Sequence, residues 1–206
     1  MSSVPPLLGL MIYPTLVHFI YAIIWVVPSL WFPRHPPLTR VKFFGRLAYS
    51  KTCVFYLLLP WYLGTLSPTL FREPYWWRIC ALIGQQRPLL QLVGIASIIS
   101  GVLLEVASFA AIGQVAILYG CKFGAQVEWV DNVWPYTWTS HPQHIGVILI
   151  QSAWVALGWT EATGMVAFIA WWAFLYGLQT LVECYLAQDE HTALRGARSS
   201  FRCRVD

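Results

Sequence analysis

The chain has 206 residues, of which 58% are hydrophobic and 11% charged, and its formal net charge is +4. A soluble domain carries about a quarter charged residues, and a chain this short cannot bury so much apolar surface in one core. These values exclude an ordinary soluble domain and predict that lipid covers much of the surface. The basic residues flank apolar runs, which favours anionic lipid headgroups and excludes a nucleic-acid partner.

The N-terminal half contains two long runs without formal charge. The first, 8–32, is long enough to cross a bilayer and contains Pro14 and Pro28, so we expect one helix with a kink. A basic loop at 34–46 follows. The second run, 52–71, predicts a second spanning helix.

The second half contains three more apolar runs. The longest, 89–119, is interrupted only by Glu105. A loop at 120–141 rich in Trp and Tyr is typical of a segment in the membrane interface. The runs 145–160 and 162–182 predict a hairpin of two helices that enters the membrane from one side and returns to it.

We therefore expect an all-α fold, a polytopic helical bundle in the membrane with three full spans and a C-terminal helical hairpin, or four to five membrane segments. Its predicted parts are the N-terminal transmembrane helices and connecting loops at 1–88, a core at 89–190, and a basic cytoplasmic tail at 191–206.

The distribution of Lys and Arg predicts the orientation. If the N-terminus faces the lumen, ten basic residues face the cytoplasm and three face the lumen, as the positive-inside rule requires. The cytoplasmic set is Arg34, Arg40, Lys42, Arg46, Lys51, Lys122, Arg195, Arg198, Arg202 and Arg204, and the luminal set is Arg72, Arg78 and Arg87.

Glu105 is an ionisable residue at membrane depth, which is costly and therefore a candidate for function. It shares one helical face with small and polar residues, namely Gly94, Ser97, Gly101 and Ser108. Two interpretations remain open at equal weight: tight helix packing through small residues, or a groove that admits a ligand.

Two histidines stand one turn apart at a predicted helix start, in Ser140-His141-Pro142-Gln143-His144-Ile145-Gly146. Pro142 suits the first helical position, and His141 precedes it as the cap residue. Such a pair could bind a metal. However, no Cys or carboxylate stands at ligand spacing nearby, and the five dispersed cysteines form no CxxC, so we predict no metal.

Glu183 ends the last apolar run. Trp172, Tyr176, Gln179, Glu183 and Glu190 recur at helical spacing, which places an aromatic and acidic face on one helix. This face is either an interfacial aromatic anchor with a solvated carboxylate or a binding face for a cation.

These motifs resemble the phospholipid N-methyltransferase family over about residues 89–190. The resemblance rests on Ser108-Phe109, Ile112-Gly113, Tyr119-Gly120, Phe123-Gly124, the His141–Gly146 element and Glu183. The broader group includes the isoprenylcysteine carboxyl methyltransferases. The family's Gly-x-Gly element falls on Ile99-Ser100-Gly101 and its acidic pair on Val182-Glu183, so one glycine and one acid are present.

The resemblance implies an endoplasmic-reticulum enzyme that uses S-adenosylmethionine to methylate the amine of phosphatidylethanolamine or its mono- and dimethyl derivatives, in phosphatidylcholine synthesis. It implies cofactor contacts at Gly101, Gly113, Pro142, Gly146 and Glu183. His141, His144 and Glu105 are the candidates for orienting or deprotonating the acceptor amine, and the active site is expected to face the cytoplasm.

Two alternatives remain. One is carboxyl methylation of a prenylated protein, which Glu105 disfavours because an acid near the acceptor suits an amine. The other is a membrane scaffold or transporter subunit without catalysis. A transporter is expected to show inverted repeats and paired broken helices, and the sequence shows neither.

Overall fold

A computed structural model describes residues 4–66, 88–127, 132–156 and 165–194 of the chain. These residues form α-helices and two short 3-10 helices, with no strand among them. The all-α prediction is confirmed for this part of the chain. The helices are α1 (Val4–Val26), η1 (Pro28–Leu30), α2 (Pro37–Leu66), α4 (Pro88–Ile117), η3 (Cys121–Phe123), α5 (Pro142–Ala156) and α6 (Met165–Leu194).

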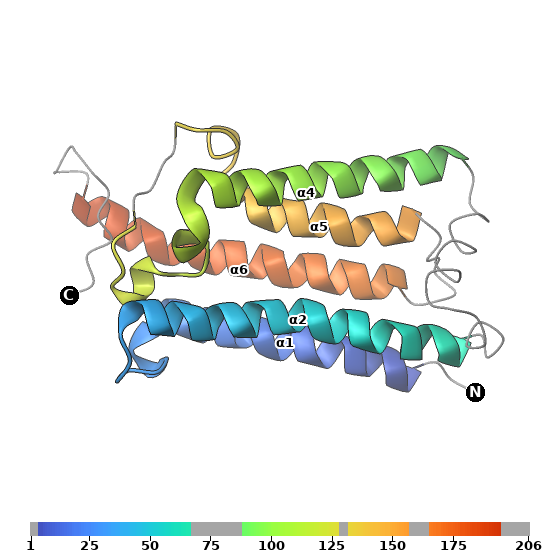
Figure 1. Cartoon of the computed structure of the whole chain (residues 1–206), viewed down its shortest axis with the longest axis horizontal. Helices are drawn as coiled ribbons and strands as arrows, with labels where there is room; N and C mark the ends of the chain where they lie inside the picture. The colour runs from blue at the N-terminus through green and yellow to red at the C-terminus, as the bar shows by residue number, and fades with distance from the viewer. Residues whose placement is uncertain (1–3, 67–87, 128–131, 157–164, 195–206) are drawn as a thin grey trace.

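The long helices lie side by side along one axis (Figure 1). α4 packs along α5, and α6 packs against both α5 and α1. α1 in turn packs against α2. The N-terminal helices therefore share one bundle with the second half of the chain and can contribute side chains to a site on α6.

Two described helices are long and apolar enough to cross a membrane: Pro88–Phe123, with a mean hydropathy of 2.1, and Val166–Cys184, with 1.3. Met11–Val26 is a shorter apolar helix. The outer face of α4 exposes large apolar side chains along its length, including Leu92, Ile99 and Val106. A contiguous apolar face of this size is typical of contact with lipid rather than water.

The helix boundaries correct two predictions for the N-terminal half. The first helix ends at Val26 rather than near residue 32, because the backbone before a proline avoids the helical region and Pro28 starts η1 instead. The predicted basic loop at 34–46 is largely helical, because Pro37 begins α2 well before the apolar run at 52.

Two lysines predicted to face the cytoplasm are buried. Lys51 is 3% exposed and lies inside the bundle on α2, and Lys122 in η3 is 9% exposed, with its ammonium 4.3 Å from the centre of the Trp25 ring. The count of Lys and Arg on each side of the membrane placed both lysines in solvent, because it uses only their positions along the sequence. Helix packing brings aromatic rings from α1 and α6 around them.

The other helices of the second half follow the predicted order with shifted ends. α4 matches the run 89–119, α5 starts at Pro142 instead of 145, and α6 continues past 182 to Leu194. Several predictions lie outside the described residues. They concern the luminal residues Arg72, Arg78 and Arg87, the connection between the runs 145–160 and 162–182, the tail after 194, and the side chain of Glu190.

Candidate functional site

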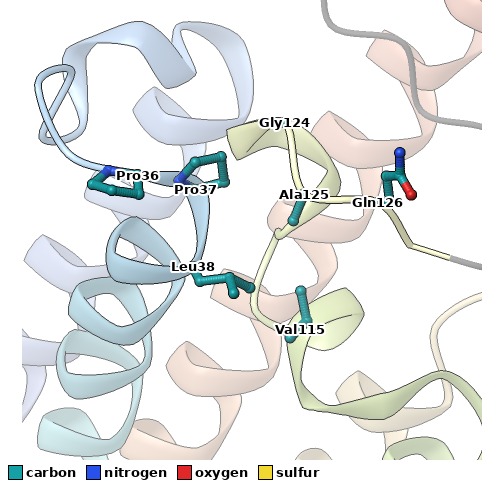
Figure 2. A pocket seen from close by; sticks show the side chains of 7 residues that line it. All are labelled: Pro36, Pro37, Leu38, Val115, Gly124, Ala125 and Gln126. Atoms are coloured by element: carbon teal, nitrogen blue, oxygen red, sulfur yellow. The ribbon is translucent and has the colours of Figure 1, made fainter.

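One pocket opens between the start of α2 and the end of α4 (Figure 2). Its cavity volume is about 470 Å³, and Pro36, Pro37, Leu38, Val115, Gly124, Ala125 and Gln126 line it. None of these side chains is titratable. The polar cluster buried between α5 and α6 does offer titratable groups.

The start of α5 places two histidines on the α6 side. Pro142 is the first residue of the helix, and the amides of His144 and Ile145 bond the His141 carbonyl. This confirms His141 as the residue before the helix. Pro142 and His144 are buried, and His141 is partly exposed.

Glu183 is only 5% exposed, and three side chains hold its carboxylate. Its Oε1 accepts hydrogen bonds from the Tyr119 hydroxyl and from Gln179 Nε2, the latter at 2.8 Å. Its Oε2 lies 3.3 Å from His141 Nδ1. Gln179 Nε2 also bonds the Tyr119 hydroxyl at 2.8 Å. Both carboxylate oxygens are therefore held in place.

A sharp turn after α4 brings Tyr119 to this carboxylate. Tyr119 has a φ of 59°, and a Cβ on Gly120 would lie 2.5 Å from the Val115 carbonyl oxygen, so only glycine fits there. The Tyr119 ring stacks on Phe44 of α2, with ring centres 4.6 Å apart. Backbone geometry and ring packing together direct the hydroxyl at Glu183.

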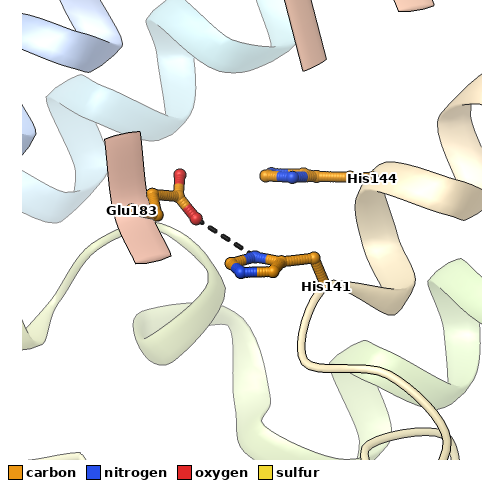
Figure 3. A group of neighbouring side chains, drawn as sticks. All are labelled: His141, His144 and Glu183. Carbon is orange, nitrogen blue, oxygen red and sulfur yellow. Dashed lines mark ion pairs between the residues drawn. The ribbon is translucent and has the colours of Figure 1, made fainter. Parts of the chain in front are cut away.

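His141, His144 and Glu183 form one group (Figure 3). The two imidazole rings stack, with centres 5.1 Å apart and planes 14° from parallel. His141 Nε2 also lies 3.3 Å from Cys184 Sγ. No carboxylate stands at ligand spacing along the sequence, but the pairing of α5 with α6 brings Glu183, 42 positions away, to His141.

This group also offers donors to a metal, since one ligand atom from each of its three residues lies within 4.8 Å of the others. Donors around tetrahedral zinc are closer, about 3.4 Å from one another, because each bond is about 2.0–2.1 Å long. The arrangement is wider than a zinc site. The absence of a resident metal stays a prediction.

The hydrogen bonds of His144 define its tautomer. The Thr180 hydroxyl donates to the Tyr176 carbonyl at 2.9 Å, so it accepts from His144 Nδ1 at 2.8 Å. Nδ1 therefore carries the proton, and Nε2 keeps a lone pair with no partner among the described residues.

Glu183 has no Lys or Arg partner among the described residues. Its one ion-pair contact there is with His141. A buried carboxylate without a Lys or Arg partner is suited to a cationic ligand.

Gly101 and Gly146 lie where α4 crosses α5. A Cβ on Gly101 would lie 2.6 Å from the Gly146 carbonyl oxygen, and one on Gly146 would lie 2.9 Å from the Gly101 oxygen. The two backbones are thus in contact. This contact supports the interpretation that the small residues allow tight helix packing. Gly113 has a φ of 77° and breaks the helical geometry of α4. The cofactor contacts of these glycines and of Pro142 stay predictions.

Glu105 lies on the same face but makes no hydrogen bond to the histidines or Glu183. Its Oε1 is buried without a hydrogen-bond partner among the described residues. A Cβ on Gly146 would lie 3.3 Å from Glu105 Cγ and Oε1, so the carboxyl group stands beside the first turns of α5.

The aromatic face of α6 is turned inward. Trp172, Tyr176, Gln179 and Glu183 are all buried, so this face is not a solvated interfacial anchor. The rings of Trp172 and Tyr176 surround the Lys51 ammonium, with ring centres 5.4 and 4.4 Å away. The use of this face to bind a cationic ligand stays a prediction.

Three residues that bond Glu183 or His144 were not assigned a role from the sequence. Gln179 stands four residues before Glu183, so helical spacing could have identified it. Thr180 stands on the adjacent row, where the helical repeat alone does not connect it with His144. Tyr119 lies in the Tyr119-Gly120 motif, but only the turn after α4 explains its contact with Glu183.

One comparison with known proteins identifies a family for the second half of the chain. A family model described as phospholipid methyltransferase matches residues 89–189, which include the end of α4, the histidine pair and Glu183. Searches of curated proteins and of solved structures gave no match. The second half of the chain, with its buried Glu183 and paired histidines, belongs to the phospholipid methyltransferase family.

Proposed function

We propose that the chain is an S-adenosylmethionine-dependent methyltransferase that acts on the amine of phosphatidylethanolamine or its mono- and dimethyl derivatives. The observation that supports this most strongly is Glu183, a buried carboxylate with fixed geometry and no Lys or Arg partner in the part of the chain that the structure describes. It lies within the residues that the family model matches.

The residues present fit a cationic methyl donor. S-adenosylmethionine supplies a methyl group on a positively charged sulfur, and its transfer to an amine leaves a neutral thioether. Glu183 would attract that cation and hold it through charge. Tyr119 and Gln179 keep the carboxylate oriented, and the surrounding helices exclude water, which strengthens the attraction.

The acceptor amine must be neutral before it attacks, so a proton has to leave it. His144 is the better acceptor of that proton, because its Nε2 has a lone pair with no partner among the described residues. His141 is engaged by Glu183 and Cys184. Its role would be to orient the carboxylate and the stacked His144 ring.

The membrane placement is part of the proposal. We place four to five membrane segments in the endoplasmic reticulum, with Glu183 and the histidines near the cytoplasmic leaflet. The exposed apolar faces of α4 and α6 support contact with lipid. This location would let a soluble cofactor and a bilayer lipid meet at one site.

Carboxyl methylation of a prenylated protein is less well supported. A carboxylate acceptor would be repelled by Glu183 and Glu105, which both stand at the α4–α5–α6 interface without an Arg or Lys within ion-pair distance among the described residues. An amine acceptor suffers no such repulsion.

A matched pair of variants tests the assignment. Glu183→Gln should raise KM for S-adenosylmethionine about 10- to 150-fold, the range expected for a lost charge-assisted contact. Glu105→Gln makes the same change of charge and should leave KM for the cofactor within about threefold, because Glu105 would serve the lipid. Initial rates with labelled S-adenosylmethionine give both constants. Equal effects of the two variants would contradict the role of Glu183.

A further inference from the structure

Lys51 is a buried lysine that the site described above does not use. It is 3% exposed and lies midway along α2. Its Nζ donates to the Tyr176 hydroxyl at 2.7 Å and lies 3.1 Å from His18 Nε2. These contacts join α1, α2 and α6 around one ammonium group.

Two of the three N–H bonds of Lys51 are used by these contacts. The third has no acceptor among the described residues, and no carboxylate there lies within ion-pair distance. Aromatic rings fill much of its surroundings, with the Tyr21 centre 5.3 Å and the Tyr176 centre 4.4 Å from Nζ. A buried ammonium without a counter-ion is costly, so its position indicates a function.

Glu105 is the acidic counterpart of Lys51. Its carboxyl group stands beside Gly146 on α5, and it forms no ion pair with Lys51 among the described residues. Oε1 of Glu105 is also left without a hydrogen-bond partner among the described residues. The bundle thus holds a separated cation and anion, on α2 and α4, each with unused hydrogen-bonding capacity.

His144 belongs to the same neighbourhood. Its ring centre lies 5.1 Å from that of Tyr176, the residue that binds Lys51. Nε2 of His144 is the free proton acceptor identified above. A ligand that bridges Lys51 and Glu105 would therefore lie next to the group that can take its proton.

We propose that Lys51 and Glu105 form the subsite for a zwitterionic phosphoethanolamine headgroup, with the phosphate at Lys51 and the ammonium at Glu105. This inference rests on the proposed function and adds a residue outside the family-matched region. A lysine ammonium binds phosphate as a point charge, and the Tyr176 hydroxyl stands beside it as a second group for the phosphate oxygens. His18 is a positioning residue, because it accepts a hydrogen bond from Lys51 and orients the ammonium.

The test compares two acceptors that differ only in the phosphate. One is phosphatidylethanolamine, and the other is a diacylglycerol with an aminoethyl ether in place of the phosphoethanolamine. Both are presented to the purified full chain in mixed micelles with labelled S-adenosylmethionine. The variants are Lys51→Met, which keeps the length but removes the charge, and Lys51→Arg, which keeps the charge.

We expect the wild-type chain to have a KM about 10-fold or more lower for phosphatidylethanolamine than for the phosphate-free amine, since one charge-assisted contact gives this range. Lys51→Met should remove this preference by raising the first KM, with the second changed less than about threefold, and Lys51→Arg should keep most of it.

Three outcomes decide the matter. Equal wild-type KM values for the two acceptors would overturn the subsite, even if Lys51→Met does not fold. A loss of rate on both acceptors in Lys51→Met, with unchanged preference, would show a structural role and also overturn it. No transfer to either acceptor by the wild-type chain would instead overturn the proposed function, and the subsite with it.

Discussion

The contact between Gly101 and Gly146 makes a sharp prediction about stability. In Gly101→Ala the new methyl group would lie 2.6 Å from the Gly146 carbonyl oxygen, 2.7 Å from Ile150 Cγ1 and 3.1 Å from the Ile150 amide nitrogen. Two of these three atoms belong to the α5 backbone, which cannot move away as a flexible side chain could. α4 and α5 would have to separate.

Overpacking of this kind costs about 1–3 kcal/mol, or a factor of about 5 to 150 in the unfolding equilibrium. Gly177→Ala is the matched control, because Gly177 lies on the exposed face of α6 and a Cβ there meets nothing within 4 Å. Alanine favours the helix over glycine by about 1 kcal/mol at such a position, so the control should be neutral or more stable.

The assay is unfolding of the detergent-solubilised protein in increasing SDS, followed by far-ultraviolet circular dichroism. Gly101→Ala should lower the midpoint, and Gly177→Ala should not. A Gly101→Ala protein as stable as the wild type would refute the backbone contact. If such a protein also had a raised KM for S-adenosylmethionine, Gly101 would serve the cofactor rather than the helix pair.

Three further predictions concern the buried polar cluster. Tyr119→Phe removes one donor to Glu183 and leaves Gln179 and His141 in place, so kcat/KM for S-adenosylmethionine should fall about 10- to 100-fold; a change below about twofold would contradict the assigned hydrogen bond. His144→Gln removes the assigned proton acceptor, so kcat should fall about 100-fold or more, and an unchanged kcat would argue against that role. Because the donors of His141, His144 and Glu183 are spaced more widely than zinc ligands, methyl transfer should survive dialysis against EDTA. Loss of activity that added zinc restores would show that the group is a metal site.

The helices could be anticipated from the sequence more easily than their ends. Long apolar runs gave α1, α4, α5 and α6 in order, because a spanning helix requires about 20 apolar residues. The start of α2 was missed, since Arg40 and Lys42 interrupt the apolar pattern without interrupting the helix. Local charge says little about helicity where Pro37 favours a helix start.

The site was predictable in its parts but not in its assembly. The motif at 141–146 and Glu183 were identified as candidates, yet their contact depends on how α5 packs against α6, which no spacing along the chain reveals. Lys51 was assigned to the cytoplasmic surface for the same reason. Its burial depends on rings from α1 and α6 that surround it only in the folded bundle.

The roles of the glycines illustrate a second limit. Gly101 fits both a cofactor element and a helix crossing, and the sequence does not separate these interpretations. The backbone contact with Gly146 favours packing as the reason that no side chain is tolerated there.

The most direct test of the central claim is methyl transfer by the purified chain reconstituted in liposomes. Labelled S-adenosylmethionine would be supplied with phosphatidylethanolamine and, separately, with its monomethyl and dimethyl derivatives, and the extracted lipids would be separated by chromatography. We predict labelled lipid from at least one of these acceptors and its loss in Glu183→Gln. No labelled lipid from any of them, with a folded wild-type protein, would contradict the account.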